Sequence, residues 1–117
     1  MDQSTQETRK EYTVVLSEIA IRNIDEITGY IAFINHQPGN AIKVGDAIFE
    51  TIDRIALRPF AFKECPLLPT KTHIYRQAHC YNWLIIYRVA KEHIMILGII
   101  HGSRQPSNIK GLKKIKG

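Results

Sequence analysis

The strongest constraint on the fold comes from two apolar runs of seven residues, which lie close together in the second half of the chain. They span residues 83–89 and 94–100 and are separated by the short polar stretch 90–93. Both are rich in β-branched and aromatic side chains, and their close spacing is typical of a β-hairpin. Because apolar side chains occupy both faces of this hairpin, it needs a central place in a sheet with at least one covered face.

Alternation along these strands predicts which side chains share a face. Strict alternation places His101 on the same face as Met95, Leu97 and Ile99. Glycine at position 98 of such a strand predicts a β-bulge or the close approach of another segment. In the first run, Leu84, Ile86 and Arg88 are expected on one face, and Trp83, Ile85, Tyr87 and Val89 on the other.

An amphipathic helix is predicted upstream, beginning after Ser17. The Ser17 hydroxyl can accept hydrogen bonds from the first helical amides. The helix is expected to stop by His36, because Pro38 disfavours helical geometry in the residue before it. Its apolar stripe has the spacing of one helix face and consists of Ala20, Ile24, Ile27, Ile31 and Ile34.

A second amphipathic helix follows, with Asn40 as its expected N-cap and Arg58-Pro59 as its end. The two helices, joined by a short connection, form an αα-hairpin that needs an apolar sheet to pack on. The second apolar stripe consists of Ala41, Val44, Ile48, Ile52 and Ile55.

The remaining segments complete an α+β fold. Residues 12–16 and 74–78 are predicted strands, and residues 60–72, which contain two prolines, are predicted to form a surface loop. The order is β-α-α-β-β-β: an antiparallel meander sheet with the αα-hairpin packed on one face and the other face more open. The domain is expected over residues 12–109, between a loose lead-in at 1–11 and a basic tail at 110–117.

Composition narrows the class of protein. A chain of 117 residues is the size of one domain, and no run approaches the roughly 18 apolar residues of a membrane helix. The polar start has no features of a signal peptide, so a cytoplasmic location is expected.

Cys65 and Cys80 form no Cys-x-x-Cys pair, and the spacing of His73, His79 and Cys80 matches no common metal site. We therefore expect neither a metal nor a cofactor.

Charge is distributed unevenly along the chain. Residues 1–57 hold five Lys or Arg against nine Asp or Glu, whereas residues 58–117 hold eleven against two. This asymmetry predicts a basic face that suits an acidic partner or a phosphate backbone. The four lysines after Ile109 have a simpler explanation as a solvated end. Arg76, Arg88 and Arg104 fall in the sheet region and are expected to line one positively charged surface.

Several of these segments resemble the RelE/ParE superfamily of bacterial toxins, the toxin halves of type II toxin-antitoxin modules. The resemblance covers about residues 12–108. It rests on the element order, on Tyr12-Thr-Val-Val-Leu-Ser17, on Ala20, residues 24–31 and 55–59, on Ile85-Ile-Tyr-Arg-Val89, and on the ending His101-Gly-Ser-Arg104. That ending is most similar to the ParE and plasmid-stabilisation branch.

The resemblance implies one of two targets. ParE-like members poison DNA gyrase by binding, and Arg76, Arg88 and Arg104 would then contact the target. RelE-like members cleave messenger RNA on the ribosome, and Arg76, His101 and Arg104 would then be catalytic. RelE-like enzymes usually have a tyrosine after the last arginine, but this chain continues Gln105-Pro-Ser-Asn. A ParE-like toxin is therefore the leading hypothesis, the RelE-like nuclease is the alternative, and whether the chain is an enzyme stays open.

Both branches imply a cognate antitoxin that folds over the toxin, with Ile27, Ile31 and Ile48 as expected contacts between the helices. A toxin-antitoxin hetero-oligomer is then expected in the cell. A third hypothesis is a non-toxic module that binds nucleic acid or protein.

Overall fold

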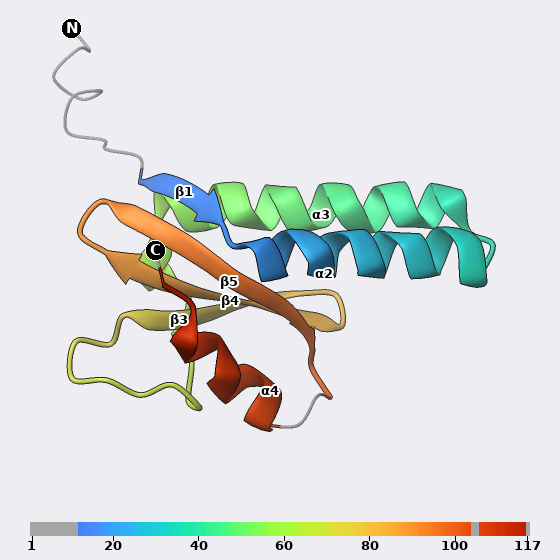
Figure 1. Cartoon of the computed structure of the whole chain (residues 1–117). Helices are drawn as coiled ribbons and strands as arrows, with labels where there is room; N and C mark the ends of the chain where they lie inside the picture. The colour runs from blue at the N-terminus through green and yellow to red at the C-terminus, as the bar shows by residue number, and fades with distance from the viewer. Residues whose placement is uncertain (1–11, 104–105, 117) are drawn as a thin grey trace, which may run out of the picture.

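A computed structural model describes residues 12–103 and 106–116 of the chain. A five-stranded sheet with the order β1-β5-β4-β3-β2 carries two long helices on one face and short helices on the other (Figure 1). The elements are β1 (Thr13–Leu16), α2 (Glu18–Gly29), a π-helical segment (Tyr30–Ile34), α3 (Pro38–Leu57), a 3-10 turn (Pro59–Ala61), β2 (Lys63–Glu64), β3 (Tyr75–Cys80), β4 (Trp83–Ala90), β5 (His93–His101), α4 (Pro106–Lys110) and a final 3-10 turn (Gly111–Lys114).

The predicted α+β fold is confirmed, including the helical hairpin on the sheet and the meander of β3, β4 and β5. Both meander turns have two residues, and the first residue of each, Tyr81 or Lys91, has a positive φ. Such turns follow the right-handed twist of paired strands. The first strand, whose place the sequence left open, lies parallel to β5 at the edge of the sheet, with Thr13 opposite His93.

The helical hairpin packs through the stripes that its periodicity predicted. The α3 positions Ala41, Val44, Ile48, Ile52 and Ile55 are all buried against the sheet. Ser17 is the N-cap of α2, as expected, and its Oγ accepts a hydrogen bond from the Ala20 amide at 3.0 Å. The N-cap prediction for α3 is wrong. That helix begins at Pro38, whose fixed φ suits the first helical position, with Gln37 before it.

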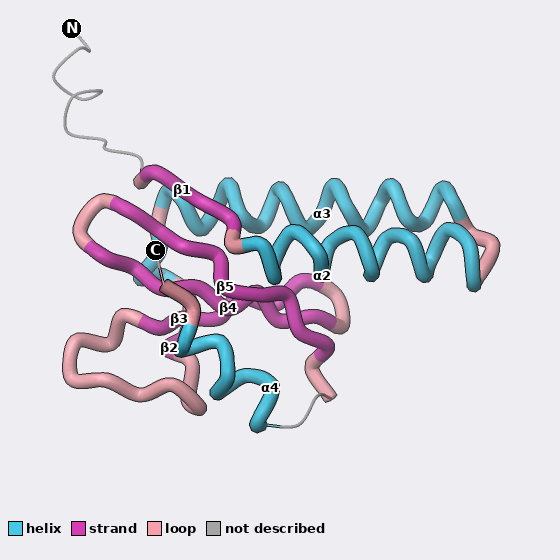
Figure 2. The backbone as a smooth tube through the Cα atoms, viewed as in Figure 1, coloured by secondary structure: helices cyan, strands magenta, loops and turns pink. Residues whose placement is uncertain are grey.

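The end of the first helix departs from the predicted stripe at Ile34, which is 62% exposed. Residues Tyr30–Ile34 form a π-helical turn, and its wider winding rotates the last apolar side chain away from the core. The two helices also extend well past the sheet, as Figures 1 and 2 show. Among the described residues, the sheet therefore ends before the tip of the hairpin (Figures 1 and 2).

Strict alternation in β5 is wrong beyond Leu97 because the strand has a bulge. Ile86 of β4 pairs with Gly98, whereas the next residue, Tyr87, pairs with Ile96. The extra residue shifts the alternation, so that Ile99 joins the helix-side core together with Ile94 and Ile96. The bulge predicted from Gly98 is thus confirmed. It moves each β5 side chain that follows to the face opposite the one predicted by strict alternation.

The second face of the sheet is covered, which corrects the expectation of a more open face. The C-terminal cap, defined here as residues 106–116, lies across this face (Figure 2). Ile109 and Leu112 of the cap are buried against Leu84, Ile86 and Leu97. Part of the segment predicted as a tail therefore closes a second apolar core.

Residues 60–72 are more ordered than the predicted surface loop. They contain β2 and the Phe60-Ala61 part of a 3-10 turn, and Cys65 and Leu68 are buried in the second core. Burial raises the pKa of the Cys65 thiol, which keeps it protonated.

In the part of the chain that the structure describes, no helix combines the length and apolar character needed to cross a membrane.

Candidate functional site

A groove of about 980 Å³ lies where the C-terminal end of β5 meets α2 and the C-terminal cap. Residues of α2 and the π-helical segment line one wall of the groove, and residues of the cap line the other. The lining comprises Ile19, Asn23, Glu26, Ile27, Tyr30, Ile31, Asn35, Trp83, Ile99, Ile100, His101, Ser103, Ser107, Asn108, Gly111 and Leu112.

The wall formed by α2 is held against β5 by hydrogen bonds to the strand edge. Strand β1 ends at Leu16, so the rest of β5 lacks a neighbouring strand on that side. Ser17 Oγ donates to the Leu97 carbonyl at 2.9 Å, and Asn23 Oδ1 accepts from the Ile99 amide at 3.0 Å. The side chains of Ser17 and Asn23 thus replace the missing strand as hydrogen-bond partners of the β5 backbone.

The bulge brings His101 to the groove. Because the alternation shifts at Gly98, His101 pairs with Trp83 and shares its face, instead of the face of Leu97. The Trp83 and His101 rings meet edge to face, with centroids 6.0 Å apart. A strand without the bulge would direct His101 to the side covered by the C-terminal cap.

Hydrogen bonds determine the neutral tautomer of His101. Its Nδ1 accepts from the Ser103 amide at 3.2 Å and lies 2.8 Å from the Ser103 hydroxyl. Since an amide only donates, Nδ1 is an acceptor, and the proton of the neutral ring is on Nε2. His101 is therefore available as a hydrogen-bond donor through Nε2.

The lining suits the binding of a polypeptide better than phosphodiester chemistry. Ile27, Ile31, Ile99 and Leu112 supply apolar surface, while asparagine, serine and histidine side chains supply polar groups. Among the described lining residues there is one carboxylate, Glu26, and no lysine or arginine.

Arg76, one of the predicted site residues, is used within the fold. Its Nε donates to the His73 carbonyl, and its Nη1 donates to the Phe62 carbonyl, each at 3.0 Å. The guanidinium also lies 4.8 Å from the centroid of the Phe60 ring. Arg76 therefore fastens the segment that follows α3 to the edge of the sheet.

The expectation that Arg76 and Arg88 line one surface is wrong. Arg76 pairs with Tyr87 and shares its face, on the helix side, whereas Arg88 pairs with Tyr75, which belongs to the second core. The two arginines therefore lie on opposite faces. Arg88 Nη1 donates to the Ile115 carbonyl at 2.8 Å and so helps to hold the C-terminal cap.

The residues predicted as a catalytic set are not brought together where the structure describes them. Arg76 is opposite Tyr87 and His101 is opposite Trp83, four residues away along β4. That separation corresponds to about 13 Å, and the two residues are on strands that flank β4 on opposite sides. Arg104, the third member, lies outside the described residues.

Two of the three expected antitoxin contacts, Ile27 and Ile31, line the groove, whereas Ile48 is 0% exposed in the core beneath α3. Sequence reasoning missed the other groove residues of α2. A signal was available, because these residues recur at helical spacing on a second stripe beside the core stripe. That second stripe consists of Ile19, Asn23, Glu26 and Tyr30, beside Ile27 of the core stripe.

Two solved structures share this fold. The first is described as the chromosomal ParDE toxin-antitoxin system from P. aeruginosa; it has a TM-score of 0.61 and 19% identity, with 78% of this chain and 96% of that chain covered. The second is the toxin-antitoxin complex RelBE2 from Mycobacterium tuberculosis; it has a TM-score of 0.51 and 18% identity, with 79% and 99% covered. Identities this low show similarity of fold.

The sequence itself shows the family. No curated protein matches the chain. The family model for the ParE toxin of type II toxin-antitoxin systems, parDE, matches residues 14–106, which extend from β1 to the start of the C-terminal cap. The chain therefore belongs to the ParE toxin family of type II toxin-antitoxin systems.

Proposed function

We propose that this toxin stops bacterial growth by binding DNA gyrase and does not cleave messenger RNA. The observation that carries the proposal is membership of the ParE family over residues 14–106. The placement of Arg76 and His101 supports it, since a nuclease needs its proton-transfer group and its cation around one phosphate.

Two measurements on the same induced culture test the target. Growth arrest is expected together with loss of plasmid supercoiling, and purified toxin should inhibit supercoiling by gyrase in vitro. Messenger RNA ends should stay unchanged, whereas new ends within translated codons would overturn the proposal in favour of the RelE-like nuclease. Normal growth after induction of folded protein would favour a non-toxic binding module.

Arg104 remains the proposed contact with the target. It follows the groove residues His101 and Ser103 in the sequence. Arg104→Ala is expected to abolish growth inhibition while leaving the melting temperature unchanged. Arg76→Ala is the contrasting variant, because it removes hydrogen bonds to three backbone carbonyls and should lower stability by about 1 to 3 kcal/mol. Full toxicity of the Arg104 variant would remove that residue from the site.

We infer that the groove receives a segment of the cognate antitoxin. The groove combines apolar surface from Ile27 and Ile31 with polar groups, the combination that suits an amphipathic peptide. Both similar structures are described as toxin-antitoxin systems or complexes. An antitoxin seated here would also cover His101 and Ser103, next to Arg104 in the sequence, which accounts for neutralisation by occlusion.

A matched pair of α2 variants tests the groove. Ile19 lines the groove and is 37% exposed, whereas Ile21 is 50% exposed on the same helix and is not part of the lining. Ile19→Asp is expected to weaken antitoxin binding by about tenfold or more, and Ile21→Asp by less than about threefold. Calorimetry with the protein encoded beside the toxin provides the measurement. Equal effects of the two substitutions would exclude the groove as the receptor.

A further inference from the structure

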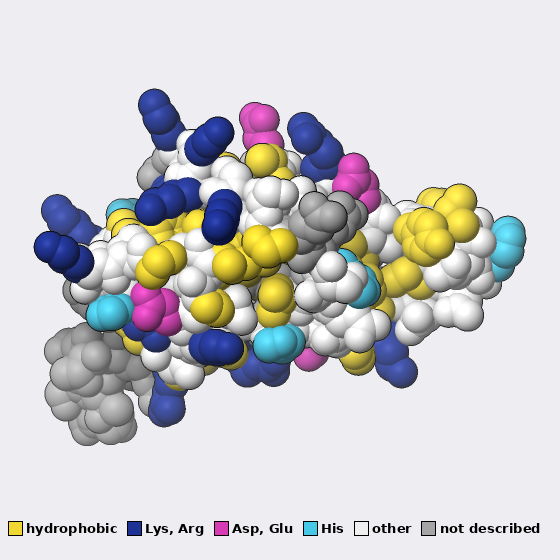
Figure 3. All heavy atoms as spheres, turned by 90° about the horizontal axis from the view of Figure 1, so that it is seen from below, with side chains coloured by type: hydrophobic (Ala, Val, Ile, Leu, Met, Phe, Trp, Pro, Cys, Tyr) yellow, Lys and Arg dark blue, Asp and Glu magenta, His cyan; other side chains and the backbone are white. Residues whose placement is uncertain are grey.

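The C-terminal cap carries a lysine-rich surface in a part of the chain that has no acidic residue. Lys110, Lys113, Lys114 and Lys116 are all exposed, and the sequence contains no Asp or Glu from residue 93 to residue 117. Figure 3 shows many Lys and Arg side chains over the sheet end of the molecule, with hydrophobic side chains between them and at the tip of the helical hairpin. The cap itself therefore supplies positive charge and no acidic side chain.

The lysines are held on a fixed base. Ile109 and Leu112 are buried against the sheet, and the Ile115 carbonyl accepts a hydrogen bond from Arg88. Lys113 Nζ lies 6.0 Å from the centroid of the Tyr75 ring. The lysine-rich segment is therefore not a solvated end, because two buried side chains and one backbone hydrogen bond hold it on the sheet.

Helical spacing brings two of these charges together and a third next to them. Lys110 and Lys113 stand at positions i and i+3, which places them on one side of the α4 and 3-10 segment, and Lys114 follows directly. Over four residues such a segment advances about 6 to 8 Å. An array this short and this dense in charge matches a polyanion with closely spaced fixed charges, and duplex DNA carries one negative charge per about 1.7 Å of its axis.

The cap lacks the features that polypeptides and single strands need. Among the described residues after Tyr81, no large hydrophobic side chain is exposed. Protein interfaces are enriched in aromatic anchors and depleted of lysine, and single-stranded nucleic acids bind by stacking on exposed aromatic rings. Tyr75, the ring beside Lys113, is buried. A phosphate backbone needs neither kind of contact, because it binds through charge alone.

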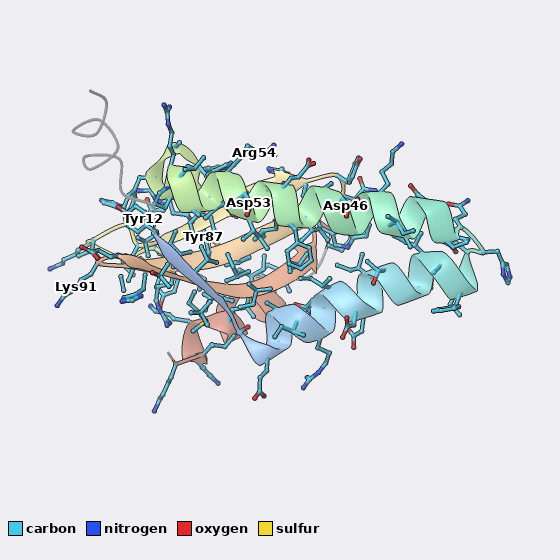
Figure 4. The ribbon with its side chains drawn as sticks, turned by 90° about the horizontal axis from the view of Figure 1, so that it is seen from above. Tyr12, Asp46, Asp53, Arg54, Tyr87 and Lys91 are labelled. Atoms are coloured by element: carbon cyan, nitrogen blue, oxygen red, sulfur yellow. The ribbon has the colours of Figure 1, made fainter. Side chains whose placement is uncertain are left out.

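The geometry points to the C-terminal cap as a binding surface for the phosphate backbone of duplex DNA. We propose that the toxin makes this contact itself, independently of sequence, and in addition to any contact with gyrase. The opposite layer of the molecule carries acidic residues such as Asp46 and Asp53 on α3, which Figure 4 shows on the helical side. DNA repels the acidic residues of the helical layer and attracts the lysines of the cap. The toxin is therefore oriented with the sheet side toward DNA and the helical hairpin away from it.

Two triple variants with equal net charge test the proposal. Lys110, Lys114 and Lys116 are changed to Gln in the first, which spares the Lys113 contact with Tyr75. Arg22, Lys43 and Arg54 of the helical hairpin are changed to Gln in the second. Each set removes three positive charges from exposed positions and lowers the formal net charge from +5 to +2. Binding of each full-length chain to a labelled duplex of about 20 base pairs is followed by fluorescence anisotropy between about 50 and 200 mM salt.

The cap variant is expected to bind about tenfold or more weakly at low salt. Because each lost phosphate contact removes about 0.9 from the slope of log affinity against log salt, its slope should become shallower by about 2 to 3. The hairpin variant should bind within about threefold of the unmodified chain. No binding by the unmodified chain, or equal losses in the two variants, would overturn the proposal.

Competitors separate duplex DNA from other polyanions. A single strand of the same sequence and poly-glutamate are each expected to displace the duplex poorly. Either competitor acting as well as unlabelled duplex would show a surface for generic polyanions or acidic polypeptides and would overturn the assignment. Since no gyrase is present in this assay, its result is independent of whether gyrase is the target.

Discussion

Gly98 lies directly beneath the side chain of Leu112, so that a Cβ at position 98 would stand 3.1 Å from Leu112 Cδ2. The same position would be 3.3 Å from Asn23 Oδ1, which accepts the Ile99 amide. One glycine at the bulge of β5 thus allows the C-terminal cap and α2 to approach the strand together. Both walls of the groove depend on this close approach.

Gly98→Ala is therefore expected to lower the free energy of unfolding by about 1 to 3 kcal/mol, because the added methyl group overpacks this contact. The measurement is urea denaturation followed by circular dichroism. Gly29→Ala is the control, since a Cβ there meets nothing within 4 Å. At this helical site alanine should be neutral or stabilising by up to about 1 kcal/mol.

A double-mutant cycle identifies the partner in this contact. In a Leu112→Ala background, which itself costs stability, Gly98→Ala should become much less destabilising, because the side chain that it meets is gone. Additive losses in the double variant would show that the strain arises elsewhere, at Asn23 or in the strand backbone.

Tyr87→Phe tests the attachment of the turn after α3. The Tyr87 hydroxyl is buried and donates to the Pro59 carbonyl, 28 positions earlier in the sequence. Figure 4 shows this tyrosine on the sheet beside α3. Loss of the hydroxyl leaves a carbonyl without its donor and should cost about 1 to 3 kcal/mol in urea denaturation. Tyr81→Phe is the matched control, because Tyr81 is exposed at the turn between β3 and β4 and should change stability by less than about 0.5 kcal/mol.

Alkaline pH should destabilise the protein partly through the same tyrosine. Burial raises the pKa of Tyr87 above its ordinary value of 10.0, so the folded state holds the phenolic proton more tightly than the unfolded state does. The resulting contribution to stability is complete below about pH 10 and is lost as the pH rises toward the folded-state pKa. Between pH 8 and pH 11, the free energy of unfolding should therefore fall more for the unmodified chain than for Tyr87→Phe. Parallel profiles would contradict this prediction.

Ile48→Asp is expected to prevent folding. Ile48 is 0% exposed between α3 and the sheet, and a carboxylate there would be buried without a partner, at a cost above about 4 kcal/mol. Ile42→Asp, on the same helix at 67% exposure, should leave the circular dichroism spectrum and the melting temperature nearly unchanged. A folded Ile48 variant would show that this part of the core tolerates water.

Local features of the structure followed directly from the sequence. The Ser17 cap, the α3 stripe from Ala41 to Ile55 and the β4 alternation depend on the repeat of a helix or a strand over neighbouring residues. A short stretch of sequence is enough to specify such a repeat. The asymmetry of charge between the two halves was also readable, because each half builds mainly one layer of the molecule.

Tertiary structure decided which other residues join Ile27 and Ile31 at the site. The direction of the His101 side chain depends on which residue of β5 is unpaired at the bulge opposite β4. The role of Asn23 depends on the backbone of Ile99, 76 positions away in the sequence. The sequence by itself determined a ParE-like helical hairpin on a meander sheet. Contacts between segments far apart in the chain decided that α2 and the C-terminal cap enclose a groove and that the lysine-rich end lies fixed on the sheet. The energies of these contacts depend on segments that meet only in the folded chain. Such contacts produce no local repeat in the sequence.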